Sequence, residues 1–216
     1  IPCVGGKVSL YNETSDGPIK PTPVIGVIGL IDKKPLKIQK INSGDSLIMI
    51  GDTKDELGGS EYSEYIHKFI GGKCPAVDFS ESKKNMNCVL DVIENELIKS
   101  AHDCSKGGLT IAISELCMIN QIGCNVSLEK IPGEKLDSDK ILFSESHSRY
   151  LLTIENKNLS KLEETLKKYG VSYSLIGEFT GDSICFSSDS KPIIDLSVDK
   201  AQKTWFNSLK EMVLHA

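Results

Sequence analysis

The sequence lacks several features that mark specialised proteins. No apolar run approaches the roughly 20 residues that a membrane-spanning helix needs. Acidic and basic residues are interspersed, and a net charge of -5 leaves no basic footprint for nucleic acid. These absences predict a globular protein whose partners are small molecules or proteins, with no nucleic-acid or membrane partner.

Cysteine pairs at metal-binding or redox spacing are also missing. The seven cysteines are an odd number, and no two of them form a C-x-x-C motif, so we expect neither a zinc knuckle nor a dithiol centre. Without a signal peptide, the expected location is the cytoplasm, with reduced and mostly buried thiols. Because Ile1 is followed at once by what reads as a strand end, we expect a piece of a longer polypeptide.

Arginine is almost absent. Of the 25 basic residues, Arg149 is the sole arginine, so a planar bidentate contact to phosphate or carboxylate has one candidate. The alternative is a structural ion pair between Arg149 and a nearby carboxylate. Both roles fit the sequence.

What is present predicts an α+β fold. Strands are expected near 46–51, 101–103, 124–129, 149–155, 172–179, 183–187 and 192–195, and helices at 81–99, from 108, at 160–169 and from 199. Helices mixed with runs of adjacent strands favour α+β over a doubly wound sheet.

Two of these helices carry detailed expectations. Ser160 to Glu163 reads as a capping box that opens a helix, which Gly170 ends. The last helix is expected to be capped by Asp199 and to turn three apolar side chains inward, namely Trp205, Leu209 and Met212.

The first 40 residues differ in character from the rest. Residues 1–11 predict a strand, a turn and a second strand. The β-branched run 21–31 predicts a buried strand, and its two glycines allow another part of the protein to approach its backbone closely. The polar, turn-rich segment 32–45 places a domain boundary near residue 40. We therefore expect two parts, 1–40 and 41–216.

The first stretch with candidate chemistry follows the apolar start of the chain. Gly5 and Gly6 can leave N–H groups open to an anion, while Lys7, Ser9 and Asn12 offer a cation, a hydroxyl and an amide. A Gly-Gly pair beside a strand is more often a bulge or tight turn, so this stretch needs support from elsewhere.

A second stretch runs from Asp103 through Ser105 to Gly107 and Gly108. An aspartate at a strand end beside N–H groups at a helix start suits phosphate with magnesium. The alternative is that Ser105 caps the helix and Asp103 fixes the turn. The spacing matches neither a P-loop nor a dinucleotide fingerprint, and Cys104 reads as a small packed residue.

The third stretch, 144–149, places three serines, Glu145 and Arg149 before a strand, which favours a ligand-facing loop. His102 and His147 have no evident partner carboxylate, so structural or surface roles are favoured. No Ser/His/Asp or Cys/His arrangement can be assembled, and no nucleophile is assigned.

Five motifs in order resemble a known family. They are Gly-Gly-Lys-Val-Ser-Leu-Tyr-Asn-Glu at 5–13, Pro-Thr-Pro-Val-Ile-Gly-Val-Ile-Gly-Leu-Ile at 21–31, Leu-Gly-Gly-Ser-Glu-Tyr at 57–62, Ser-Ala-His-Asp-Cys-Ser-Lys-Gly-Gly-Leu at 100–109 and Leu-Phe-Ser-Glu-Ser-His-Ser-Arg at 142–149. Together they resemble the C-terminal part of phosphoribosylformylglycinamidine synthases, the synthetases of purine biosynthesis. The resemblance runs from residue 3 to the final helix.

The resemblance implies an aminoimidazole-ribonucleotide-synthetase-like fold. Residues 1–40 would be the tail of the second N-terminal-type domain and 41–216 the second C-terminal-type domain. The family converts formylglycinamide ribonucleotide, ATP, glutamine and water into formylglycinamidine ribonucleotide, ADP, phosphate and glutamate. ATP and Mg²⁺ are the implied cofactors.

The implied partners are the N-terminal half of the same synthetase, a glutaminase subunit that supplies ammonia, a small accessory subunit and the nucleotide substrate. Nothing in this chain matches the family's catalytic histidine. The chain by itself is therefore expected to be inactive.

The resemblance also implies roles for single residues. Gly6 would contact ATP and Ser9 the substrate, while Lys7 stands where the family usually has a magnesium-binding asparagine. An ammonium group cannot ligate Mg²⁺, so Lys7 departs from the pattern, although it can neutralise phosphate charge. An auxiliary nucleotide or phosphate pocket would take the remaining candidates, Asp103, Ser105, Gly107, Gly108, Glu145, Ser146 and Arg149.

Two alternatives stand beside this reading. The chain could be a non-catalytic scaffold module of the synthetase that binds no ligand. It could also be a related synthetase, such as aminoimidazole ribonucleotide synthetase, selenophosphate synthetase or the hydrogenase-maturation protein, although the motifs at 57–62 and 100–109 fit these less well.

Overall fold

A computed structural model describes residues 2–19, 22–31 and 40–214. The chain divides into two compact units, Ile1–Pro35 and Leu36–Ala216. Most of the segment that predicted the domain boundary, 32–39, lies outside the described residues. The assignment of 1–40 and 41–216 to two domain types stays a prediction.

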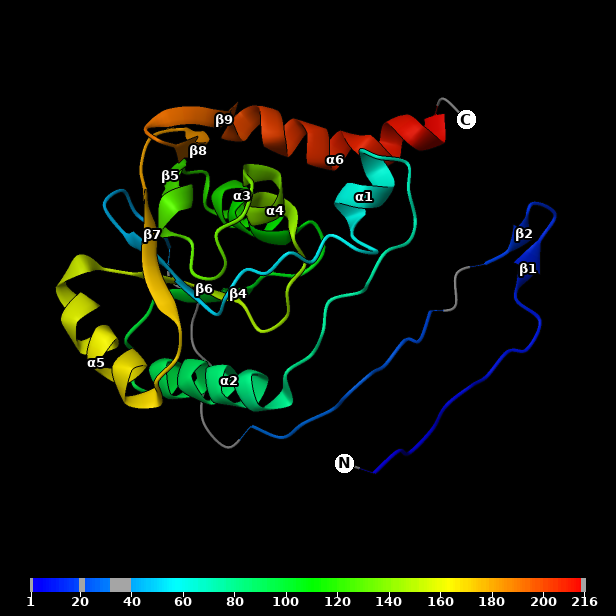
Figure 1. The fold of residues 1–216 in the computed structure, drawn as a ribbon, viewed down its shortest axis with the longest axis horizontal. Coiled ribbons are helices and arrows are strands. Elements are labelled where there is room, and N and C mark those ends of the chain that lie inside the picture. The colour runs from blue at the N-terminus through cyan, green and yellow to red at the C-terminus, as the bar shows by residue number, and fades with distance from the viewer. Residues whose placement is uncertain (1, 20–21, 32–39, 215–216) are drawn as a thin grey trace. The chain divides into compact units, whose positions relative to one another are not determined.

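The described part of the first unit contains one short hairpin. β1 (Glu13–Thr14) pairs antiparallel with β2 (Gly17–Pro18) (Figure 1). The prediction of a buried strand in 21–31 is wrong for its described part, because residues 22–31 have no regular secondary structure and Ile28 is fully exposed. Residues 2–11 likewise form no strand. A strand needs a neighbour for its N–H and C=O groups, and the described part of this unit offers only the two-residue ladder.

The second unit is a seven-stranded sheet with helices. The strands are β3 (Ser46–Ile50), β4 (Ser100–Asp103), β5 (Cys124–Ser127), β6 (Tyr150–Ile154), β7 (Tyr173–Phe179), β8 (Ser183–Ser188) and β9 (Lys191–Ser197). The helices are α1 (Glu61–Tyr65), α2 (Phe79–Glu94), α3 (Gly108–Asn120), α4 (Ser138–Phe143), α5 (Leu159–Tyr169) and α6 (Val198–Leu214), with short 3₁₀ helices at Leu128–Lys130 and Asn156–Asn158.

The sheet has the order β4-β6-β3-β7-β5-β8-β9, and its neighbours are antiparallel except for the parallel pair β5 and β8. A mostly antiparallel sheet with helices is an α+β fold, as predicted. All seven strands predicted for the second unit are present, with ends that differ by a few residues.

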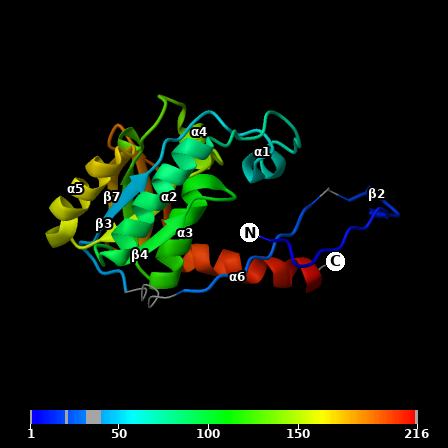
Figure 2. The same cartoon turned by 90° about the horizontal axis from the view of Figure 1, so that it is seen from below.

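Helices cover both faces of the sheet (Figures 1 and 2). The central strand β3 is buried along its whole length, and its side chains alternate between two cores. Leu47 and Met49 pack with α3, α4 and the start of α6, whereas Ile48 and Ile50 pack with α2 and α5. The apolar run at 47–50 is thus continuous because both faces of the strand are covered.

Several helix details differ from the prediction. α5 begins at Leu159, and its N-cap Asn158 makes no side-chain capping bond, so the capping box at Ser160 is wrong. Gly170 ends α5 in the left-handed conformation, as predicted. α2 starts at Phe79 because the Asp78 carboxylate accepts N–H groups of its first turn.

The last helix departs most from expectation. α6 begins at Val198, which places Asp199 in the first turn instead of at the cap. Trp205, Leu209 and Met212 are 52%, 68% and 64% exposed, so the prediction that they face inward is wrong within this chain. The helical spacing predicts α6 correctly, but none of the described elements of the second unit covers this stripe.

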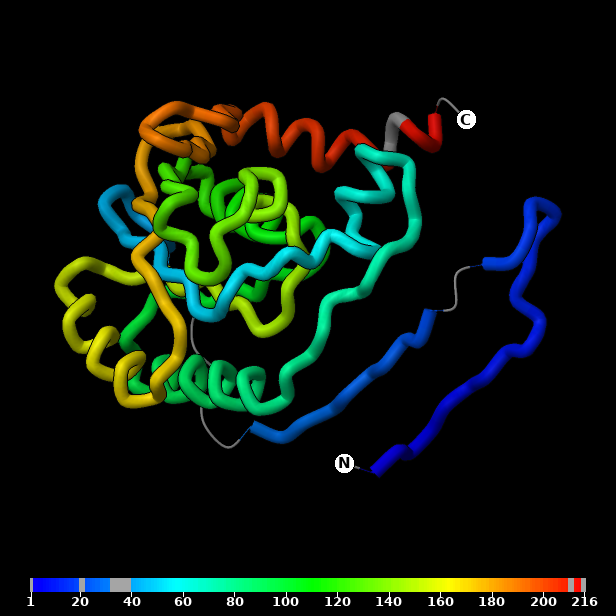
Figure 3. Tube along the Cα trace, in the orientation of Figure 1, coloured from blue at the N-terminus to red at the C-terminus, as the bar shows by residue number. Residues whose placement is uncertain are grey.

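Two short helices were not predicted, α1 and α4. α1 lies in the connection from β3 to α2, which can be followed in Figure 3. This connection folds back on itself, since the N–H of Gly59 donates to the carbonyl of Gly71 at 2.8 Å. Ser60 caps α1 by accepting the N–H of Ser63.

Candidate functional site

The second and third candidate stretches meet at one edge of the sheet. β4 pairs antiparallel with β6, and Asp103 at the end of β4 lies opposite Tyr150 at the start of β6. The turn after β4 and the loop before β6 are therefore neighbours. Between them opens a hollow of about 390 Å³, lined by Asp103, Cys104, Ser105, Lys106, Glu145, His147, Ser148, Arg149 and Tyr150.

In the turn after β4, Ser105 holds Asp103. The Ser105 hydroxyl donates to Oδ2 of Asp103 at 2.6 Å. This hydrogen bond lowers the pKa of Asp103, against an opposing effect of partial burial. The N-cap of α3 is Gly107, not Ser105. Asp103 is thus a well-ionised, exposed carboxylate at the rim of the hollow.

A carboxylate of the chain itself already occupies the N-terminal end of α3. Oε1 of Glu145 accepts the N–H of Gly107 at 2.9 Å and the N–H of Glu61 at 2.9 Å. One carboxylate oxygen therefore joins the N-terminal ends of α3 and α1, where helix dipoles favour negative charge. Lys106 pairs with the Glu61 carboxylate at 2.7 Å, which raises the pKa of Lys106.

Gly108 is required by packing. Its φ is +67°, and a Cβ there would lie 2.6 Å from the carbonyl oxygen of Ser144. The start of α3 therefore lies directly against the backbone that follows α4. Gly108 thus serves close packing between the second and third stretches, whereas a Cβ on Gly107 would meet the side chain of Ile111 in α3.

Arg149 is buried and faces main-chain acceptors. It is 1% exposed, its Nε donates to the carbonyl of Ser146 at 3.0 Å and its Nη2 to the carbonyl of Ser144 at 2.5 Å. Its Nη1 donates to the hydroxyl of Thr53 at 3.1 Å. Burial lowers the pKa of Arg149. The guanidinium thus fixes its own loop against the segment after β3.

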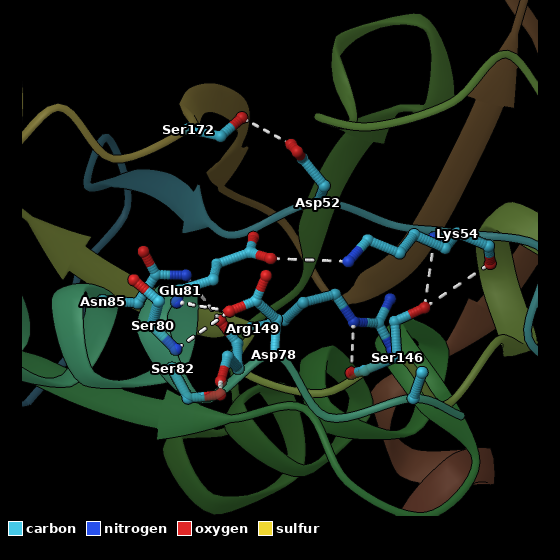
Figure 4. A network of polar contacts seen from close by, with 12 residues as sticks. Asp52, Lys54, Asp78, Ser80, Glu81, Ser82, Asn85, Ser146, Arg149 and Ser172 are labelled. Atoms are coloured by element: carbon cyan, nitrogen blue, oxygen red, sulfur yellow. Dashed lines mark hydrogen bonds and ion pairs between the residues drawn. The ribbon is translucent and has the colours of Figure 1, made fainter. Parts of the chain in front are cut away.

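The serines of the same loop make matching contacts. The Ser146 hydroxyl accepts the N–H of Lys54 at 3.1 Å, and the Ser144 hydroxyl accepts the N–H of Glu56 at 3.3 Å. Figure 4 shows Arg149, Ser146 and Lys54 in this network. The loop predicted to face a ligand therefore uses the side chains of two of its serines and of Arg149 to hold residues 53–56 by hydrogen bonds.

His102 has a partner that the sequence did not reveal. Its Nε2 lies 3.3 Å from Oε2 of Glu115 on α3, and its Nδ1 lies 2.6 Å from the carbonyl oxygen of Asp103. A spacing of 13 residues across a turn carries no recognisable signal, so only the packing of α3 beside β4 shows the pair. Cys104 is buried, which raises the pKa of its thiol to about 11 and fits the expected packed residue.

A second polar hollow of about 570 Å³ was not predicted. It lies beside the start of α2 and the end of α5, and is lined by Asp52, Asp78, Ser80, Glu81, Lys84, Gly170, Val171 and Ser172. Its carboxylates have partners (Figure 4): Asp78 caps α2, Asp52 accepts from Ser172 at 2.5 Å and Glu81 pairs with Lys54 at 3.4 Å.

Gly6, Lys7 and Ser9 belong to the first unit and are exposed. A Cβ built on Gly5 or Gly6 would meet no atom within 4 Å. Asn12 donates from its amide to the carbonyl of Ser9 at 2.5 Å, a local contact within the stretch. The roles of Gly6, Lys7 and Ser9 stay predictions.

Across the described ranges, no three His, Cys, Asp or Glu side chains gather closely enough to hold a metal ion. Asp103 offers one carboxylate, and Mg²⁺ often binds through one or two carboxylates together with phosphates of a ligand. Asp103 therefore fits magnesium only in company with a phosphate. No helix in the described part of the chain is long and apolar enough to cross a bilayer.

Comparison with known families and proteins places this geometry in context. The family model described as AIR synthase related protein, C-terminal domain, matches residues 42–187. Phosphoribosylformylglycinamidine synthase subunit PurL of Methanocaldococcus jannaschii is 37% identical over 99% of this chain and 30% of its own length. PurL of Alkaliphilus metalliredigens is 34% identical over 97% of this chain and 28% of its own length. The chain thus spans less than a third of these relatives.

Solved structures share the fold. Thermotoga maritima PurL complexed with FGAR has a TM-score of 0.69 and 19% identity, over 77% of this chain and 29% of that one. Escherichia coli HypE, a hydrogenase maturation protein, has a TM-score of 0.54 and 16% identity, over 77% and 52%. At these identities the likeness concerns the fold alone.

Proposed function

Because the chain belongs to the family described as AIR synthase related protein, C-terminal domain, we propose that it works as part of a phosphoribosylformylglycinamidine synthase. The supporting observation is the identity of 37% with a PurL subunit over 99% of the chain. The proposed reaction is the ATP-dependent conversion of formylglycinamide ribonucleotide to formylglycinamidine ribonucleotide with glutamine-derived ammonia. It belongs to purine biosynthesis in the cytoplasm.

Within that protein, residues 41–216 are proposed to be the second C-terminal-type domain and 1–40 the tail of the second N-terminal-type domain. The family model begins at residue 42, in support of this division. The proposed partners are the rest of the synthetase, a glutaminase subunit and a small accessory subunit. A solved PurLQS structure from Thermotoga maritima supports a multi-subunit assembly.

The stretch at residues 5–13 is proposed to bind ligands, with Gly6 in contact with ATP and Ser9 in contact with the substrate. Thermotoga maritima PurL has been solved with ATP and with FGAR, which supports these ligand classes. Lys7 is proposed to neutralise phosphate charge, since its ammonium group cannot ligate Mg²⁺.

The auxiliary nucleotide site is proposed at the hollow beside the β4–α3 turn. Asp103 would face a magnesium ion and Lys106 the phosphates. Glu145 already accepts the N–H of Gly107, so phosphate can reach that N–H only if the carboxylate moves. Ser146 and Arg149 would shape the hollow from behind, since their polar atoms hold the 53–56 segment.

The test is the formation of formylglycinamidine ribonucleotide with ammonia as the donor. The longer polypeptide that contains this chain should turn over, and residues 1–216 alone should not, because the synthetase's first half is missing. Turnover by residues 1–216 alone would contradict the proposal. So would a longer polypeptide that is folded but inactive.

One observation favours a second candidate, a scaffold module without a ligand of its own. The charged groups of Glu145 and Arg149 already have main-chain hydrogen-bond partners inside the chain. Calorimetry of the longer protein with Mg-ADP separates the two candidates. Heat from a site that Asp103→Asn removes supports the auxiliary nucleotide site, and its absence supports the scaffold.

A further inference from the structure

The apolar face of α6 and the groove beside it are uncovered. Five side chains on this face are 52% to 70% exposed, namely Trp205, Phe206, Leu209, Met212 and Val213. Their spacing places them on one stripe of the helix. Figures 1 and 2 both show the second half of α6 extending past α3 and α4.

The groove continues this apolar stripe onto α3. It has a volume of about 480 Å³ and is lined by Met118, Ile119, Trp205 and Phe206 together with His102, Glu115, Gln121 and Gln202. Ile119 is 75% exposed. Uncovered patches that combine tryptophan, phenylalanine and methionine are typical of protein interfaces.

The polar groups at the groove are paired with one another. His102 faces Glu115 at 3.3 Å, and the amide of Gln121 donates to the side-chain oxygen of Gln202 at 2.9 Å. An apolar surface can therefore cover the groove without leaving these atoms unpaired, which would otherwise be costly. The occupant that fits is an apolar protein surface.

The polar face of α6 argues against a lipid bilayer as the occupant. It carries an ion pair between Asp199 and Lys203 at 2.7 Å, next to Lys200. Helices that lie on membranes usually have a strongly basic polar face, whereas this one mixes both signs. A protein partner is favoured.

We propose that the α6 stripe and its groove dock another domain of the same polypeptide, through apolar side chains of that domain. The two curated relatives compared above are more than three times as long as this chain, since it covers 30% and 28% of them. Most of such a polypeptide lies outside these 216 residues and is available to cover the stripe. The identity of the occupant rests on the proposed function, because it assumes the synthetase's length.

The single tryptophan of the chain, Trp205, provides the probe. Residues 1–216 labelled with 5-fluorotryptophan give one ¹⁹F resonance. We expect this resonance to shift on addition of the remainder of the synthetase polypeptide as a separate, unlabelled chain, and to stay unchanged when residues 1–216 are concentrated alone. A shift with concentration alone would instead identify a second copy as the occupant and overturn the proposal, as would no shift with the remainder.

Matched variants make the test specific to this face. Leu209→Ser should weaken the association at least tenfold, as followed by the titration of the Trp205 resonance. Leu90→Ser, on the exposed side of α2, is the control and should not weaken it. Equal affinity of the Leu209 variant and the wild type, with circular dichroism showing both folded, overturns the proposal.

This readout is independent of the activity assay. If docking is observed but no amidine is formed, the proposed function fails and the docking surface stands. If amidine is formed but the Trp205 resonance does not respond, the docking surface fails and the proposed function stands.

Discussion

At the scale of single residues, Ser105 and Asp103 show how a local contact sets a charge. The hydroxyl of Ser105 lowers the pKa of Asp103 below its ordinary value of 3.8. A carboxyl group with a lowered folded-state pKa stabilises the fold above its unfolded pKa, and this contribution is lost as the pH falls through the folded value.

Ser105→Ala should therefore raise the pKa of Asp103 and lower the free energy of unfolding at pH 7. The loss of stability relative to wild type should shrink as the pH falls from 3.8 through the lowered pKa of folded Asp103, because below that pKa the carboxyl group is protonated in both proteins. Carboxyl ¹³C NMR titration measures the pKa. Ser105→Thr keeps the hydroxyl and serves as the control, and an unchanged pKa in the alanine variant would refute the assignment.

Lys7 stands where the resemblance implies a magnesium-binding asparagine, and its role stays a prediction. In the longer polypeptide, Lys7→Asn should shift the magnesium concentration needed for half-maximal rate, because an amide oxygen can ligate Mg²⁺ and an ammonium group cannot. Lys191→Asn, on the exposed β9, is the matched control. Identical magnesium titrations for wild type and the Lys7 variant would argue against a metal-proximal position.

At the scale of elements, α3 depends on a glycine for its approach to the chain after α4. Gly108 and Gly170 have similar φ angles, +67° and +62°, but only Gly108 has neighbours within 4 Å of a built Cβ. Comparing the two positions separates backbone strain from close packing.

Gly170→Ala should cost about 1 to 2 kcal/mol of folding free energy, from the left-handed backbone alone. Gly108→Ala should cost about 1 to 3 kcal/mol more, because its Cβ would lie 2.6 Å from the carbonyl oxygen of Ser144. Urea denaturation measures both. Equal losses at the two positions would show that packing against Ser144 contributes nothing.

At the scale of the whole molecule, the two units differ in how far their backbone N–H and C=O groups are paired in strands. Residues 22–31 have no regular secondary structure and are exposed, whereas β3 is paired on both sides and buried. In residues 1–216 alone, amide hydrogen exchange should be fast in 22–31 and slow in β3.

The same segment tests the proposed division into domains. If 1–40 is the tail of an N-terminal-type domain, amides in 22–31 should exchange much more slowly in the longer polypeptide, where the apolar run can find its sheet. Strong protection in residues 1–216 alone would contradict the first expectation, and fast exchange in both proteins would contradict the second.

Much of the second unit was decided by the sequence, because its signals are local. The apolar run at 47–50, the helical spacing in α2 and α3, and the left-handed glycine at 170 each act over a few residues. Each element is present, although α2 spans Phe79–Glu94 and ends five residues before the predicted 81–99 does. The five motifs identified the family for the same reason, since they depend on residue order alone.

The tertiary structure decided which groups meet. Glu145 accepts N–H groups at the N-terminal ends of two helices, and Arg149 donates to main-chain carbonyls. His102 lies beside Glu115. These contacts depend on strand pairing and packing, which the spacing of residues in the sequence does not reveal. Periodicity likewise marked the apolar stripe of α6 but could not say what covers it. Periodicity shows that one face of a helix is apolar. Which surface packs against that face depends on the tertiary structure.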